Sequence, residues 1–168
     1  MFARAVLAFL ALPAVLAGAV PWLLARVDPW RLGGSGAGIG VLFLGGAVVA
    51  WCARDFYVAG RGTLAPWAPP TRLVVVGLYR WVRNPMYLGV LTAVLGSALA
   101  AGSPLLAVYT FALGAAFHLR VVRYEEPWLA ARFASDWAAY RQAVPRWLPA
   151  RPRVERAGFA GGGETGGR

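Results

Sequence analysis

Long apolar runs constrain the fold of this chain more than any other feature of its sequence. A helix that crosses the hydrocarbon core of a bilayer needs about 20 mostly apolar residues. Four runs approach that length, at residues 5–25, 38–53, 87–101 and 105–119. Because membrane-spanning segments must satisfy their own backbone hydrogen bonds, these runs predict an all-α integral membrane bundle of about four transmembrane helices.

Three details of these apolar runs bear on the number of membrane helices and on the turn between the last two. The first run follows Arg4 and contains "LAGA", so a signal peptide is an alternative, although the length of the run favours a retained helix. The last two runs are separated by "AGSP", residues 101–104, which predicts a tight, uncharged hairpin. The stretch "TRLVVVGLY", residues 71–79, is short for a span. We expect it at the interface, with a fifth membrane segment as the alternative.

The arginines predict the orientation of the bundle. Most of the 17 basic residues fall between residues 54 and 86 or after residue 119, whereas the first loop has only Arg26 and Arg31. Cytoplasmic loops carry an excess of basic residues. We therefore expect both basic segments on the cytoplasmic side of a bacterial inner (cell) membrane, where they can build one site.

The composition narrows the class of partner. The chain is 59% hydrophobic with a formal net charge of +10, and ordinary soluble domains are about 45–50% apolar. A basic chain can bind nucleic acid or an anionic membrane surface. The apolar excess favours the membrane, and we expect no nucleic acid and no obligate protein partner. The single cysteine, Cys52, excludes an intrachain disulfide and a cysteine zinc cluster. We predict no metal site and an inert, buried thiol.

Beyond the fourth run the pattern changes to that of an amphipathic helix. Leu129, Phe133, Trp137 and Tyr140 recur at helical spacing with charged residues between them, so we expect a cytoplasmic helix that lies on the membrane or caps the bundle. "VPRWLP", residues 144–149, ends it. Arg, Gly and Glu dominate from residue 150 on, which predicts a disordered basic tail over 150–168 after one domain over 1–149.

The stretch "YRWVRNPMYLG", residues 79–89, contains the most specific polar pattern. A residue before proline is disfavoured in helical geometry, so Asn84 is the candidate N-cap and Pro85 the first helical residue. The free N–H groups of residues 86–88 would suit an anion, with Arg83 beside them. The ring of Tyr87 offers a surface for a flat heterocycle. The alternative is an interfacial aromatic belt with cytoplasmic arginines.

A second polar stretch, "RVVRYEEPWL", places Glu125 and Glu126 at the end of the fourth run. Adjacent carboxylates repel each other and are costly near hydrocarbon. Arg120 and Arg123 lie within about one helical turn and are expected to compensate them. The pair is either a solvated helix terminus or a site for ribose hydroxyls and an amino group of a ligand.

The order "RNPMYLG", "YEEPWL" and "FASDWAAYRQAVPRWLP" resembles the isoprenylcysteine carboxyl methyltransferases and the phospholipid methyltransferases over residues 60–149. The resemblance implies S-adenosylmethionine as cofactor and a lipophilic or lipid-like methyl acceptor. It implies cofactor-binding roles for Arg83, Asn84, Pro85, Tyr87, Leu88, Gly89, Glu125, Glu126 and Tyr140. It implies catalytic roles for Arg146 and Glu125. The acceptor group, a carboxylate, a thiol or an amine, stays open.

This sequence departs from the family pattern in two places. Asn84 stands where the prenylcysteine enzymes often have histidine, which removes a titrating imidazole from that position. Ala134 stands where the family prefers glycine, and we expect an effect on the turn alone. The glycine pair of "GRG", residues 60–62, is a weak match. The only histidine, His118, is either a packed helix residue or a group that faces a pocket.

Two other classes of protein compete with this interpretation. Relatives of the membrane steroid 5α-reductases share a similar C-terminal region and use NAD(P)H, but "NPMYLG" and "YEEP" fit the methyltransferases better. A non-enzymatic membrane protein, such as a scaffold or transporter subunit, is the second alternative. Transporters place polar residues near the bilayer midplane, whereas the polar residues here cluster at one face.

Overall fold

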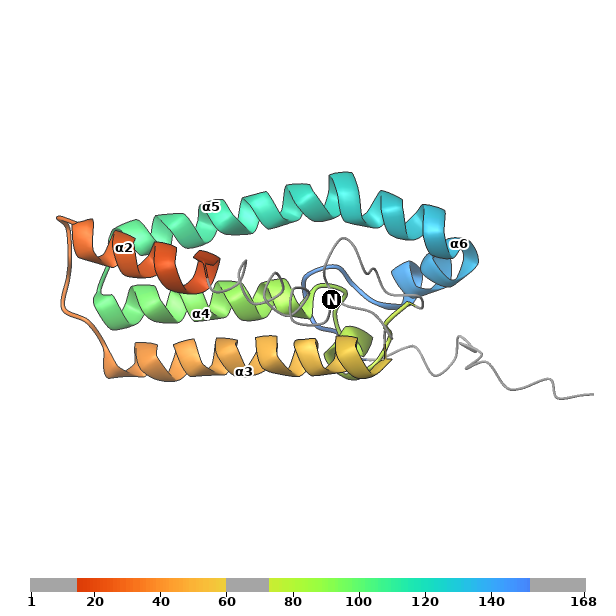
Figure 1. The fold of residues 1–168 in the computed structure, drawn as a ribbon, viewed down its shortest axis with the longest axis horizontal. Coiled ribbons are helices and arrows are strands. Elements are labelled where there is room, and N and C mark those ends of the chain that lie inside the picture. The colour runs from red at the N-terminus through yellow and green to blue at the C-terminus, as the bar shows by residue number, and fades with distance from the viewer. Residues whose placement is uncertain (1–14, 60–72, 152–168) are drawn as a thin grey trace, which may run out of the picture.

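The computed structural model describes residues 15–59 and 73–151 of the chain, and this part is helical, with no β-strand among its residues. Three long helices, α3, α4 and α5, lie side by side (Figure 1). The elements are η1 (Val15–Ala19), α2 (Val20–Val27), α3 (Gly36–Ala59), η2 (Gly77–Arg80), α4 (Pro85–Ala101), α5 (Pro104–Arg120), η3 (Val121–Glu125) and α6 (Glu126–Ala143). The all-α fold predicted from the sequence is confirmed for these residues.

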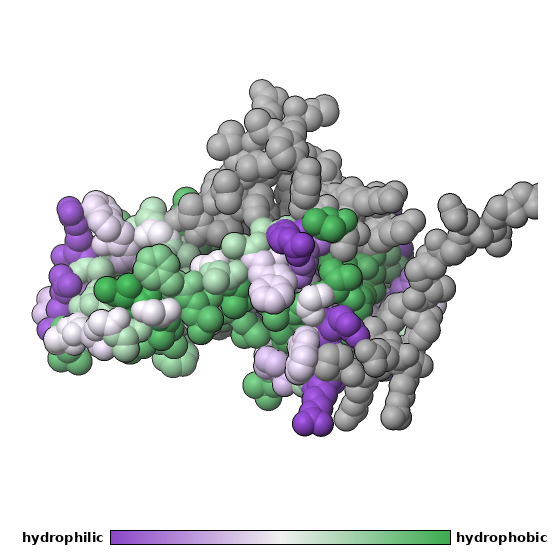
Figure 2. Space-filling model, turned by 90° about the horizontal axis from the view of Figure 1, so that it is seen from below, coloured by the Kyte–Doolittle hydropathy of each residue, from purple (hydrophilic) through white to green (hydrophobic). Residues whose placement is uncertain are grey.

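Among the described residues, two helices are long and apolar enough to cross a membrane: Gly36–Phe56 and Pro104–Ala143. Only 17% and 28% of their most apolar windows are buried inside the protein, whereas the core helix of a soluble protein would be mostly buried. Figure 2 shows the resulting apolar flank, with hydrophilic residues gathered towards its ends. These features indicate a membrane protein. The apolar helices Val15–Val27 and Pro85–Ala101 are shorter, so four spans remain a prediction.

Helices α3 and α4 touch through their backbones. A Cβ atom added to Gly38 would lie 2.2 Å from the backbone nitrogen of Ala100, and one added to Gly45 would lie 2.3 Å from that of Ala93. From the other side, a Cβ on Gly96 would lie 2.2 Å from the nitrogen of Leu42. Small residues permit such close approach between membrane helices. The contact holds α4, whose first turn carries the candidate site.

The α4–α5 hairpin has the turn that "AGSP" predicts. Gly102 ends α4 with a φ of +59°, and the Ser103 side chain caps α5 by accepting from the Leu106 N–H at 3.2 Å. Buried Asp28 accepts from the Ser103 hydroxyl and from the Leu105 N–H at 3.0 Å. The Ser103 hydrogen bond holds the pKa of Asp28 below its ordinary value. The end of α2 is thereby tied to the hairpin.

The described part of the first apolar run packs within the bundle. The Tyr109 hydroxyl of α5 donates to the carbonyl of Leu16 at 3.1 Å. The start of this run lies outside the described residues, so the choice between a retained helix and a signal peptide stays a prediction. The "GRG" glycines and nearly all of the tail, from residue 152 on, also lie outside the described residues.

The fourth apolar run and the amphipathic helix form one helix, where the sequence suggested two. A π-helical turn, η3, joins them, and the Glu126 N–H donates to the carbonyl of Val121, five residues earlier. Pro127 follows at once. Proline lacks an N–H and its ring crowds the carbonyl four residues back, and a wider turn accommodates it without a break. Glu125 and Glu126 therefore sit at the junction of α5 and α6.

The apolar face predicted for residues 129–140 is confirmed. Trp137 and Tyr140 are buried with Val144, and Leu129 and Phe133 pack against them. Leu73 and Val75 pack against the same cluster. The described part of the stretch at 71–79 is thus extended chain that leads into η2 and contacts the α6 cluster.

Ala134 lies at a kink inside α6, where its backbone has φ +34° and ψ −104°. This kink is where the family prefers glycine, and positive φ disfavours a residue with a Cβ atom. We expect Ala134→Gly to raise the free energy of unfolding by about 1 kcal/mol. Thermal unfolding in nanodiscs measures this change.

The matched control is Ala138→Gly, four residues later on the same helix. Ala138 is exposed and lies in regular helix. Glycine there should lower stability by about 1 kcal/mol, as in helix interiors generally. Equal destabilisation by both substitutions would show that Ala134 is not strained.

Candidate functional site

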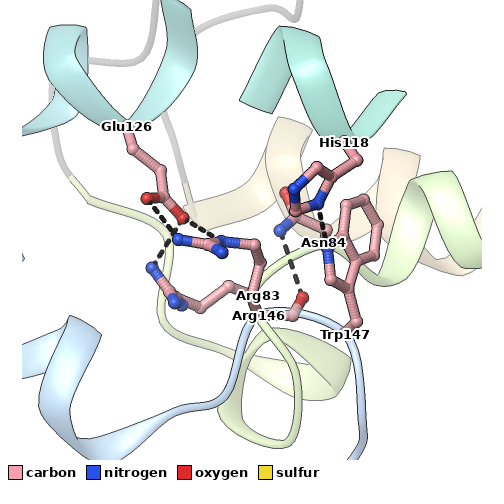
Figure 3. Close-up of polar contacts among 6 residues, drawn as sticks. All are labelled: Arg83, Asn84, His118, Glu126, Arg146 and Trp147. Carbon is pink, nitrogen blue, oxygen red and sulfur yellow. Dashed lines mark hydrogen bonds and ion pairs between the residues drawn. The ribbon is translucent and has the colours of Figure 1, made fainter. Parts of the chain in front are cut away.

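Three segments that are distant in the sequence meet at one end of the bundle: the start of α4, the η3–α6 junction and the segment after α6. The Arg83 N–H donates to the carbonyl of Pro145 at 2.9 Å, and the Ala150 N–H donates to that of Trp81 at 3.0 Å. The Asn84 side chain donates to the carbonyl of Arg146 at 3.1 Å. These bonds fix Arg146 beside the start of α4 (Figure 3).

The predicted position of the start of α4 is correct, but its predicted hydrogen bonds are partly wrong. The helix begins at Pro85 with Asn84 as N-cap, but the Asn84 side chain makes no capping bond. The Leu88 N–H, expected to be free, donates to the Asn84 carbonyl at 3.3 Å. The reason is the helix ladder itself, since the fourth residue after the N-cap is the first to donate within the helix.

Glu126 is shared by two arginines from different segments. Its Oε1 lies 2.9 Å from NH1 of Arg83 and 2.6 Å from Nε of Arg146, and its Oε2 lies 2.9 Å from NH2 of Arg146 (Figure 3). The side chains of Glu126 and Arg83 are only 12% and 9% exposed. Such charge-assisted, forked contacts are the strong and directional ones.

The two arginines of this cluster differ in environment. Burial lowers the pKa of Arg83 from its ordinary value, and the neighbouring Glu126 charge raises it. The hydrogen bond to Glu126 raises the pKa of Arg146. Because arginine stays protonated in proteins, the three groups together carry one net positive charge.

Glu125 has its own partners. Its Oε1 lies 2.8 Å from Nε of Arg120 and accepts from the Tyr87 hydroxyl. The Tyr87 ring stacks on Phe117 with centroids 4.3 Å apart. The predicted compensation by Arg120 is confirmed. The prediction for Arg123 is wrong, because this residue pairs with neither carboxylate in the described part of the chain. The cations for Glu126 come from elsewhere in the sequence.

Some residues of the predicted site lie apart from these carboxylates. Buried Gly89 faces α3, where an added Cβ would lie 2.9 Å from Cγ1 of Val48. The Tyr140 hydroxyl donates to the carbonyl of Tyr79 at 2.8 Å, within the buried α6 cluster. Pro85 is buried and Leu88 half-buried. The structure therefore brings together Arg83, Asn84, Tyr87, Glu125, Glu126 and Arg146.

Two residues with no predicted partner are also linked at this end of the bundle. The Trp147 indole N–H donates to Nδ1 of His118 at 3.1 Å (Figure 3). His118 is exposed, so its interpretation as a packed helix residue is wrong. Trp147 packs against the core cluster of α4 and α5. The motif "PRWLP" was the only sequence signal that pointed to Trp147, and it does not indicate His118 as the partner.

One buried donor at the site has no hydrogen-bond partner among the described residues. The Nε of Arg83 makes no hydrogen bond with any described residue. Buried donors are nearly always paired, and an unpaired one is a candidate ligand contact. The site thus places carboxylate acceptors beside an unpaired, buried guanidinium donor, a set of groups that matches a ligand with hydroxyls, an ammonium and a carboxylate.

These features define a membrane protein with a polar, charge-paired site at the end of an apolar helix bundle. The family model for phospholipid methyltransferase matches residues 35–136, more than half of the chain. The chain therefore belongs to the phospholipid methyltransferase family, a methyltransferase family, as the motifs predict. Searches of curated proteins and of solved structures found no match.

The matched segment contains most of the cluster but not all of it. Residues 83–89 and both glutamates lie inside it, whereas Tyr140 and Arg146 lie beyond its end. The contacts of Arg146 with Glu126 and Asn84 connect that later segment to the matched one.

Proposed function

We propose that the chain is an integral membrane methyltransferase that uses S-adenosylmethionine and acts on a lipophilic or lipid-like acceptor. The observation that carries this proposal is the position of Glu125 and Glu126 beside Arg83 and Tyr87, within the segment that matches the family. The basic residues at this end of the bundle support a cytoplasmic site in a bacterial inner membrane.

The residues of the site fit the polar groups of this cofactor. Glu125 and Glu126 accept hydrogen bonds from ribose hydroxyls or from an ammonium group. The unpaired Nε of Arg83 donates to a carboxylate. Tyr87 offers its ring edge beside Phe117 to a flat heterocycle. When bound, the cofactor supplies a methyl group activated by its sulfonium charge.

The other residues of the predicted cofactor site hold it in shape. Asn84 and Pro85 set the start of α4, and Leu88 and Gly89 continue its first turns. Tyr140 fixes the carbonyl of Tyr79 just before that start. We assign these five residues to the support of the cofactor.

Catalysis at this site rests mainly on position. Holding two reactants in place supplies a large part of the rate of such a transfer. We assign Arg146 to the acceptor side, because its side chain is 32% exposed while it is anchored to Glu126. An anionic acceptor needs no general base. An amine acceptor must be neutral to react, and Glu125, whose Oε1 is held by Arg120 and Tyr87, is the carboxylate we assign as its base.

Calorimetry of the purified protein in nanodiscs tests the cofactor. We expect binding of S-adenosylmethionine and none of NADPH, titrated in parallel. Binding of NADPH alone would instead place the chain with the membrane reductases. A folded protein that binds neither would contradict an enzymatic role.

A further inference from the structure

His118 is the only histidine of the chain, and the roles proposed above do not use it. It lies on α5 two residues before Arg120, where the apolar helix approaches the polar cluster. Its side chain is exposed rather than packed. A polar ring on the outside of an apolar helix is costly unless it faces water, protein or a ligand.

The bond from Trp147 determines which nitrogen of His118 carries the proton. An indole nitrogen can only donate, so Nδ1 of His118 must accept with a lone pair. The proton of the neutral ring is therefore on Nε2. No described residue accepts a hydrogen bond from Nε2, and the N–H points away from Trp147.

The surroundings of His118 keep this ring in place beside the candidate site. Trp147 follows Arg146, whose side chain binds Glu126 and whose carbonyl is held by Asn84 (Figure 3). Trp147 also packs against the α4–α5 core cluster, which includes Phe117. The imidazole is thus a fixed donor at the edge of the polar cluster.

The charges near His118 indicate which kind of group its Nε2–H can bind. Glu125 and Glu126 already accept from three arginines and a tyrosine. The most exposed polar side chains of the cluster are Arg120, 57% exposed, and then Arg146 and Glu125, each 32% exposed. Glu125 is paired with Arg120, and the three arginines outnumber the two glutamates, so the cluster keeps a net positive charge that favours an anionic oxygen. The exposed apolar residues Val108, Phe111 and Leu119 on α5 suit an acyl or prenyl chain.

We infer that His118 is an acceptor-binding residue, whose Nε2–H donates to an anionic oxygen of a lipophilic acceptor. The oxygen belongs to a carboxylate or to a phosphate headgroup, and both have the same hydrogen-bonding chemistry. The inference deepens the proposed function and rests on it for the methyl transfer. The role of Trp147 is that of a positioning residue, since it acts through His118.

Nitrogen NMR of protein labelled with ¹⁵N-histidine observes this single ring directly. In dodecyl maltoside at pH 8, we expect the tautomer with the proton on Nε2. Oleate and dioleoylphosphatidate, added separately, should shift the Nε2 resonance, and oleylamine should not. A response to oleate alone identifies a carboxylate as the bound group, and a response to dioleoylphosphatidate alone identifies a phosphate headgroup. A proton on Nδ1, no response to either anion, or an equal response to oleylamine would overturn the inference.

Substitutions separate this role from a structural one. His118→Phe should weaken binding of the anion that shifts the resonance about tenfold or more, as expected for a lost bond to a charged group. His118→Gln, which keeps an N–H donor, should lose less, and Trp147→Phe should have an intermediate effect. Unchanged anion binding by His118→Phe would contradict the assignment.

The affinity for S-adenosylmethionine distinguishes the two proposals. We expect it to be the same in His118→Phe and in the unmodified protein. Normal cofactor binding without any His118 response overturns this inference alone. A His118 response in a protein that never binds the cofactor leaves an anion site and overturns the proposed function.

Discussion

Glu126→Ala is expected to abolish detectable binding of S-adenosylmethionine and to lower the free energy of unfolding by about 3 kcal/mol. The carboxylate is mostly buried and holds both Arg83 and Arg146. Its removal leaves the buried Arg83 guanidinium without a counter-charge, and an uncompensated buried charge is strongly destabilising. Calorimetry and thermal unfolding in nanodiscs measure the two effects.

A double variant separates stability from ligand binding. Glu126→Leu with Arg83→Leu removes both buried charges, and hydrophobic replacement of a buried pair is often neutral or stabilising. Stability should therefore recover while cofactor binding stays lost. Asp136→Ala is the matched control, since Asp136 is an exposed carboxylate on the same helix, and it should change neither property. Cofactor binding that recovers with stability would remove Glu126 from the proposed site.

Gly45→Ala is expected to destabilise the protein by about 3 kcal/mol, at the upper end of the range for overpacking. The added Cβ would lie 2.3 Å from the nitrogen of Ala93 and 2.6 Å from the carbonyl oxygen of Gly89. Both atoms belong to the α4 backbone, so no side chain can turn away to make room. Helix α4 must move, and with it Tyr87 of its first turn and Arg83, which lies just before the helix. Thermal unfolding and cofactor affinity should fall together.

Gly46 provides a control at the next position of the same helix. An added Cβ there meets nothing within 4 Å. Gly46→Ala should therefore be neutral or stabilise the protein by up to about 1 kcal/mol, because alanine is the better helix former. Similar effects of the two substitutions would show that α3 and α4 are not in backbone contact.

Much of the fold could be predicted because membrane helices are long, apolar and bounded by clear signals. Proline at position 85 marks the start of α4, and "AGSP" marks the hairpin. The single helix from α5 into α6 was not predicted. A change from an apolar to an amphipathic pattern looks like a boundary, and nothing in the sequence reveals that a π turn accommodates Pro127.

The residues of the candidate site could be predicted from the sequence, but their hydrogen-bond and ion-pair partners could not. Motifs identified the two glutamates and the start of α4. Spacing along one helix suggested Arg123 as a partner, yet the partners of Glu126 are Arg83, 43 residues away, and Arg146, 20 residues away. Contacts between distant segments depend on how α6 turns back towards α4, which local sequence does not encode. The bond between Trp147 and His118 escaped prediction for the same reason.

The π turn at η3 has a consequence for how such a protein can diversify. A turn with more residues than an α-helical turn offsets the angular phase of everything that follows it. The outward face of α5 and the direction of Glu126, at the start of α6, are therefore offset from those of an unbroken α-helix. Under the proposed function, substitutions on the outward face of α5 can change the fit to the acceptor without turning Glu126 away from Arg83 and Arg146.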